Sequence, residues 1–110
     1  MTAALIVSTA RTPLAKSWKG AFNMTHGATL AGHAISHAIT RAGIDAGEVD
    51  DVLMGCAFPE GATGSNIARQ AALRAAVSVR AGPPRCGAAS GRRSRALGKG
   101  RVVVDLHCIR

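Results

Sequence analysis

Aromatic side chains are almost absent from this chain of 110 residues. They make up 3% of the sequence, with one tryptophan, two phenylalanines and no tyrosine. A hydrophobic core must therefore be built from Ala, Val, Leu and Ile, which bury less apolar area per side chain than aromatic residues do. The length allows one small domain or part of one, and we expect its core to be marginal.

Paired cysteines and long apolar runs are also missing. Cys56, Cys86 and Cys108 are odd in number and widely spaced, which suits neither a disulfide framework nor a CxxC zinc site. No run approaches the roughly 18 apolar residues of a membrane span, and the first residues lack the pattern of a signal peptide. We expect a cytoplasmic chain with reduced thiols and no membrane partner.

Acidic side chains are scarce in the last part of the chain. Residues 80–110 carry eight Arg or Lys and only Asp105, a net charge of +7, whereas residues 1–79 carry a net charge of +1. Residues 80–100 consist mainly of Arg, Gly, Ala and Pro without apolar periodicity. We therefore divide the chain into an ordered part, 1–79, and a basic, irregular, low-complexity tail, 80–110.

This tail suggests one function of its own. Clustered arginines neutralise phosphates and release their counterions, so a small module that binds nucleic acid or another polyanion is one reading of residues 80–110. The tail contains no interleaved aromatic residues and no known nucleic-acid motif, which argues against nucleic acid as the partner.

Residues 1–79 alternate between apolar runs and helical patterns. Continuous apolar runs over 3–7 and 51–57 predict two buried strands. Between them, residues 25–42 carry apolar side chains at spacings of three and four, which predicts a helix with Thr25 as N-cap and Gly43 just past its end.

A second helix is expected over 66–77. It follows a loop rich in glycine, and Ser65 or Asn66 is suited to cap it. The order strand, helix, strand, helix predicts an α/β fold with parallel strands. Val102 to Val104 are three β-branched residues in a row and are the candidate for a further strand.

Several polar residues are candidates for a site, each with a simpler explanation. His33 and His37 are four residues apart on one helix face, but no intervening Glu or third ligand accompanies them, so we expect no metal centre. Lys16, Trp18 and Lys19 are expected to form a solvated loop. Cys56 lies in an apolar segment and is expected to be a core residue.

The loop over residues 61–65 precedes the second helix. It lacks the lysine of a phosphate-binding P-loop and is expected to be a plain connection with a helix cap.

Cys86 is the one candidate nucleophile. Small residues follow it and arginines flank it on both sides. Cationic neighbours favour the thiolate, and small residues let a substrate approach. No general base for Cys86 can be identified among the residues near it in the sequence.

Residues 1–79 resemble the N-terminal portion of the thiolases, the family of acetyl-CoA acetyltransferases and 3-ketoacyl-CoA thiolases. The segments that carry the resemblance occur in family order and at family spacing; they are Ile6–Pro13, Ala42–Ile44, Glu48–Gly55, Pro59–Gly61 and Asn66–Arg74. The resemblance implies an α/β fold of two similar halves, with a thiolase-like βαβα fragment here. It also implies that the full-length protein is a homo-oligomer.

The resemblance also implies an acyl transfer between CoA thioesters through a Cys nucleophile, with acyl-CoA as substrate and no separate cofactor. A second Cys and a His from the family's C-terminal half complete that reaction, and neither is present here. The family's nucleophile stands in a Cys-Ser-Ser-Gly or Cys-Gly-Ser-Gly motif. In this chain Gly87 and two additional alanines separate Cys86 from Ser90 and Gly91, and we expect the chain to be inactive alone.

The change in composition after Val79 has a simple genetic explanation. Arg, Gly, Ala and Pro have GC-rich codons, so a shifted reading frame in a GC-rich gene would produce the composition of residues 80–100. We therefore hypothesise a frameshift near this point, which the nucleotide sequence would test.

Overall fold

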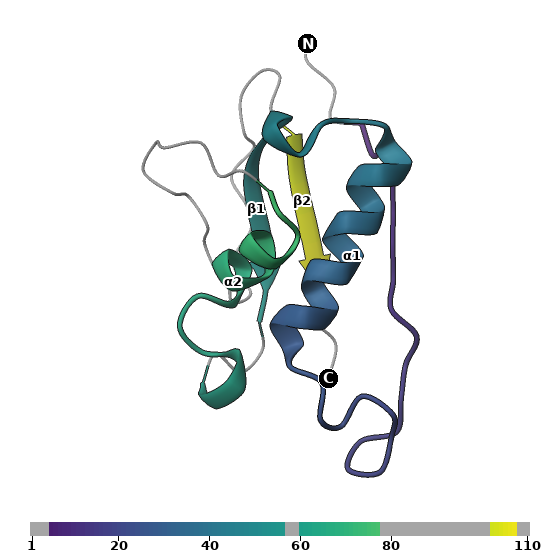
Figure 1. Ribbon diagram of the computed structural model, residues 1–110, viewed down its shortest axis with the longest axis vertical. Coiled ribbons are helices and arrows are strands. Elements are labelled where there is room, and N and C mark those ends of the chain that lie inside the picture. The colour runs from purple at the N-terminus through teal and green to yellow at the C-terminus, as the bar shows by residue number, and fades with distance from the viewer. Residues whose placement is uncertain (1–4, 57–59, 78–101, 108–110) are drawn as a thin grey trace.

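The structure, a computed structural model, describes residues 5–56, 60–77 and 102–107. Two helices, α1 (Gly27–Ala42) and α2 (Ile67–Arg74), pack beside a two-stranded sheet of β1 (Val49–Gly55) and β2 (Val102–His107) (Figure 1). Two short 3-10 turns, Ala46–Glu48 and Gly61–Thr63, precede β1 and α2. The described part is thus α/β, as the sequence predicts.

Helix α1 forms because its apolar positions recur once per turn and both of its ends are capped. Ile35 is fully buried and Ile39 is nearly so, one turn apart on the face toward the core. Gly43 ends the helix at φ 68°, a left-handed conformation that costs glycine little. The N-cap is His26, whose Nδ1 accepts a hydrogen bond from Ala28 N at 3.2 Å. The predicted cap, Thr25, is therefore wrong by one residue.

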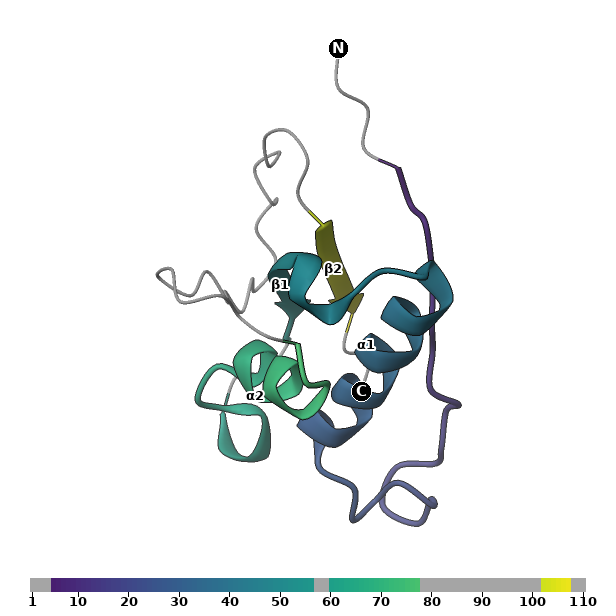
Figure 2. The same cartoon turned by 45° about the horizontal axis from the view of Figure 1, so that its top comes forward.

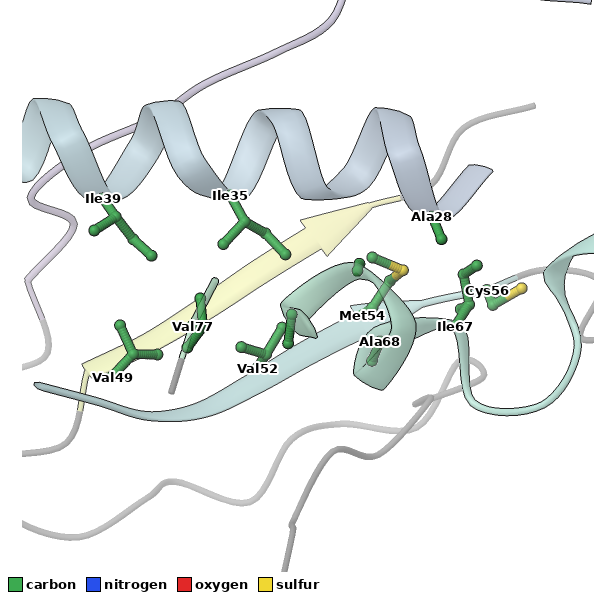
Figure 3. Packing of buried hydrophobic residues seen from close by; sticks show 12 residues of the cluster. Ala28, Ile35, Ile39, Val49, Val52, Met54, Cys56, Ile67, Ala68 and Val77 are labelled. Carbon is green, nitrogen blue, oxygen red and sulfur yellow. The ribbon is translucent and has the colours of Figure 1, made fainter. Parts of the chain in front are cut away.

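Strand β1 contributes one side of the core through alternate residues. Val52, Met54 and Cys56 are all buried, as expected for a period of two. The register with β2 shifts between Val49 and Asp51, so the strand gains one residue there, and Val49 joins the same cluster. These side chains meet those of α1 and α2 in Figure 3.

Helix α2 is shorter than the sequence predicts. Asn66 caps it, with Oδ1 accepting from Arg69 N at 3.3 Å, in agreement with the prediction. The helix ends at Arg74 and not at residue 77, because Ala76 adopts a positive φ of 54° that no helix allows. This turn brings Val77 back into the core, where it is 4% exposed.

The two helices approach closely at Gly32. A Cβ atom on that residue would lie 3.0 Å from Arg74 Cβ and 3.2 Å from the Ala71 carbonyl oxygen. Glycine at position 32 therefore allows α1 and α2 to pack at this separation, whereas any larger residue there requires a shift of the neighbouring helix.

The first predicted strand is absent from the described residues. Leu5, Ile6 and Val7 are 71–89% exposed and form no strand, so the predicted parallel pair of runs 3–7 and 51–57 is wrong over residues 5–7. The segment instead runs along α1 in both views (Figures 1 and 2), and Arg41 Nη1 donates to the Thr9 carbonyl at 3.0 Å. A buried parallel strand needs apolar cover on both faces, and the apolar faces of α1 and α2 are already packed against each other and β1.

The partner of β1 is β2, which lies parallel to it from the pair Val49 and Val102 to the pair Gly55 and His107. Residues 102–107 are therefore a strand, which corrects the prediction of an irregular tail over 80–110. The three β-branched residues at its start favour this conformation. The rest of the tail, 80–101 and 108–110, lies outside the described residues. Among the helices described, none has the length and apolar character to cross a membrane.

Candidate functional site

The carboxyl end of β1 and the start of α2 form the end of the sheet where α/β proteins place their ligands. Cys56 immediately follows β1 and is 5% exposed. Its Sγ donates a weak hydrogen bond to the Thr63 carbonyl at 3.9 Å. Cys56 is thus a core residue that joins the strand to the loop before α2, as the sequence predicts.

The loop over residues 60–66 uses its own polar groups to hold its shape. Gly64 N donates to the Gly61 carbonyl at 3.1 Å, and Thr63 N donates to the Glu60 carbonyl at 3.3 Å. Gln70 Nε2 reaches back from α2 to the carbonyls of Gly64 and Ser65, at 3.1 and 3.2 Å. Because the backbone N–H groups of Thr63 and Gly64 already donate to carbonyls within the loop, they are not free to hold a phosphate. The segment is a connection and a helix cap, as the sequence predicts.

The two histidines of α1 do meet. Their ring centroids are 4.3 Å apart with an angle of 61° between the planes, and both side chains are exposed. Within the described ranges, no three or more His, Cys, Asp or Glu side chains gather as ligands of a metal ion.

Trp18 and its two lysine neighbours form an exposed loop. Trp18 is 88% exposed, and Lys16 and Lys19 are also exposed. This fits the solvated loop that the sequence predicts.

Cys86, the predicted nucleophile, lies outside the described residues, and so does most of the tail that would bind a polyanion. Sequence reasoning also overlooked Arg41, whose guanidinium donates to the carbonyl of Thr9 in the N-terminal segment. No pattern points to it, because its partner Thr9 is 32 residues away in the chain.

Comparison with known proteins places this arrangement in a family. A model of the thiolase N-terminal domain matches residues 4–97. An acetyl-CoA acetyltransferase of Shinella zoogloeoides is 39% identical over 107 residues, which cover 94% of this chain and 26% of that protein. An acetyl-CoA acetyltransferase of Rhizobium meliloti (strain 1021) is 46% identical over 71 residues, covering 64% of this chain and 18% of that protein.

A 3-ketoacyl-CoA thiolase of Bacillus subtilis (strain 168) is 41% identical over 69 residues, which cover 63% of this chain and 18% of that protein. The chain thus spans about a quarter or less of the length of these relatives. The family match runs past residue 79, where the motifs of the resemblance end, and includes Cys86. The chain therefore belongs to the thiolase family, and its residues 4–97 match the N-terminal domain of that family.

Proposed function

We propose that this chain is the opening portion of an acyltransferase that moves acyl groups between CoA thioesters. The observation that carries the proposal is the match of residues 4–97 to the thiolase N-terminal domain, together with relatives that are acetyl-CoA acetyltransferases. Its substrate would be an acyl-CoA, its site would need no further cofactor, and its full-length form would be a cytoplasmic homo-oligomer.

We assign Cys86 as the nucleophile that carries the acyl group during the transfer. A thiolate there would attack the thioester carbonyl, form an acyl-cysteine and release CoA as its thiolate. A second thiol then takes the acyl group and restores the cysteine. The assignment is supported by the position of Cys86 within the matched range and by the arginines on both sides of it.

We further propose that the chain alone does not turn over substrate. An acyl transfer needs an acid or base and an oxyanion donor, and one oxyanion donor alone contributes about 2.7–4 kcal/mol. In the family these groups come from the C-terminal half. Purified chain should therefore cleave acetoacetyl-CoA with CoA no faster than a blank does. Turnover that Cys86→Ala abolishes would contradict this proposal and identify the nucleophile at once.

A chimera tests the family role directly. Residues 1–79 of this chain would replace the corresponding segment of the Shinella zoogloeoides acetyl-CoA acetyltransferase, which supplies the rest of the protein. We expect a soluble chimera that cleaves acetoacetyl-CoA. A matched chimera with Gly32→Leu should lose activity, because the larger side chain enters the contact between α1 and α2. A chimera that folds by circular dichroism and has no turnover would refute the proposed role.

A further inference from the structure

The proposed acyl transfer assigns no role to the histidine pair on α1, and its geometry points to a separate use. His33 and His37 are exposed, and their ring centroids lie 4.3 Å apart. Side chains four residues apart on a helix project from one face, one turn above the other. The sequence predicts no metal centre because a third protein ligand is missing. A surface chelate differs from such a centre, since water fills the positions that the protein leaves open.

The separation of the rings can be compared with the one that a shared metal ion requires. A metal bound to an imidazole nitrogen at about 2.0–2.1 Å lies about 3.2 Å from the ring centroid. Two rings at right angles about the metal then have centroids about 4.5 Å apart, and two rings at a tetrahedral angle have them about 5.2 Å apart. The observed 4.3 Å belongs to an edge-to-face contact of the two rings, and it shows that both imidazoles are near enough to reach one ion.

The donor type selects among metals, because imidazole nitrogens suit copper(II), nickel(II) and zinc(II), and the affinity of such ligands rises from nickel(II) to copper(II) and falls again at zinc(II). Copper(II) also binds nitrogen ligands most tightly among the divalent metals of the first row. Because the torsion about the Cβ–Cγ bond of histidine is broad, exposed rings can turn their nitrogens toward one ion.

The charged neighbours of the pair are few. Residues 1–44 contain no acidic side chain, so no carboxylate on α1 competes for the ion. Arg41 lies one turn beyond His37, but its guanidinium Nη1 is directed to the Thr9 carbonyl at 3.0 Å. We propose that His33 and His37 form a two-nitrogen chelate on α1 that binds copper(II), and nickel(II) more weakly.

Copper(II) titration of the full 110-residue chain tests the proposal. Reactive thiols are first blocked with iodoacetamide, and binding is then measured by calorimetry and by electron paramagnetic resonance. We expect an ion held by two nitrogens, with nickel(II) binding less tightly and zinc(II) least tightly. His33→Gln or His37→Gln should weaken copper binding about tenfold or more and leave a one-nitrogen signal. Both positions are exposed, so helix content by circular dichroism should not change.

Two controls separate this site from other imidazoles. His26→Asn removes a histidine two turns from His33 but keeps a residue suited to cap the helix, and it should bind copper as the unaltered chain does. The double variant His37→Thr with Thr40→His keeps the composition but places the two histidines about 10.5 Å apart along the helix. It should bind as weakly as His37→Gln. Equal copper affinity in this double variant and the unaltered chain would overturn the proposal, as would zinc binding more tightly than copper.

Discussion

Replacement of Gly32 by alanine tests how α1 and α2 fit together. In a solvated helix this change stabilises the fold, because alanine is about 0.8–1 kcal/mol better than glycine in a helix interior. Here the added Cβ would stand 3.0 Å from Arg74 Cβ and 3.2 Å from the Ala71 carbonyl oxygen. Neither atom is the end of a flexible side chain, so the backbone of α2 must give by a few tenths of an ångström, and overpacking costs about 1–3 kcal/mol where the neighbours do not adjust.

The two effects oppose each other, and the packing cost is the larger. We expect Gly32→Ala to lower the free energy of unfolding by about 1 kcal/mol. Ser36→Ala is the matched control, since Ser36 is exposed on the same helix and the change improves helix propensity alone. Urea unfolding, followed by circular dichroism in a stabilising osmolyte, measures both variants. If Gly32→Ala stabilises the chain as much as Ser36→Ala does, the close contact between the helices does not exist.

Four further predictions concern the core, the cap of α2, the isolated chain and its gene. Ile35→Ala empties the centre of the core and should cost about 2–5 kcal/mol of unfolding free energy, measured in the same assay. Asn66→Ala should cost more than Asn66→Gly in the same urea titration, because both lose the cap but only alanine is strained at φ 58°. In buffer without the osmolyte, with Leu5, Ile6 and Val7 exposed, the isolated chain should aggregate or unfold without a sharp transition; a cooperative transition of about 5 kcal/mol or more in that buffer would contradict this. An alternative reading frame after codons 75–80 should encode a thiolase-like continuation, and nucleotide sequencing that finds none would rule out the frameshift.

Local signals predicted the middle of the chain well. Gly43 and Asn66 are identifiable because helix ends have strong residue preferences, and Val52 and Met54 because a short continuous apolar run marks a buried strand. His26 was missed because an imidazole nitrogen is an uncommon cap. The early end of α2 was missed because the positive φ of Ala76 has no signal in the residue type.

Long-range features were less predictable. The apolar run over 5–7 has the composition of a buried strand, but burial depends on what covers it, and that is a property of the rest of the fold. The three β-branched residues at 102–104 indicate a strand, but they do not indicate that β1 is its partner. For the candidate site, the sequence indicates Cys86 by its neighbours, and the resemblance implies that the other groups of the proposed reaction come from the family's C-terminal half.

The parallel pairing of β1 with β2 has a consequence for how the chain is made. The two strands are separated by residues 56–101, 46 residues in all, so β1 leaves the ribosome well before its partner. At about 5–20 residues per second, this interval lasts about 2–9 s. During that time α1 can already pack on β1, but the edge that β2 will occupy is open to any other strand. We therefore expect nascent chains stalled before residue 102 to bind chaperones or one another more than chains stalled beyond β2, a difference that crosslinking of stalled ribosome complexes would measure.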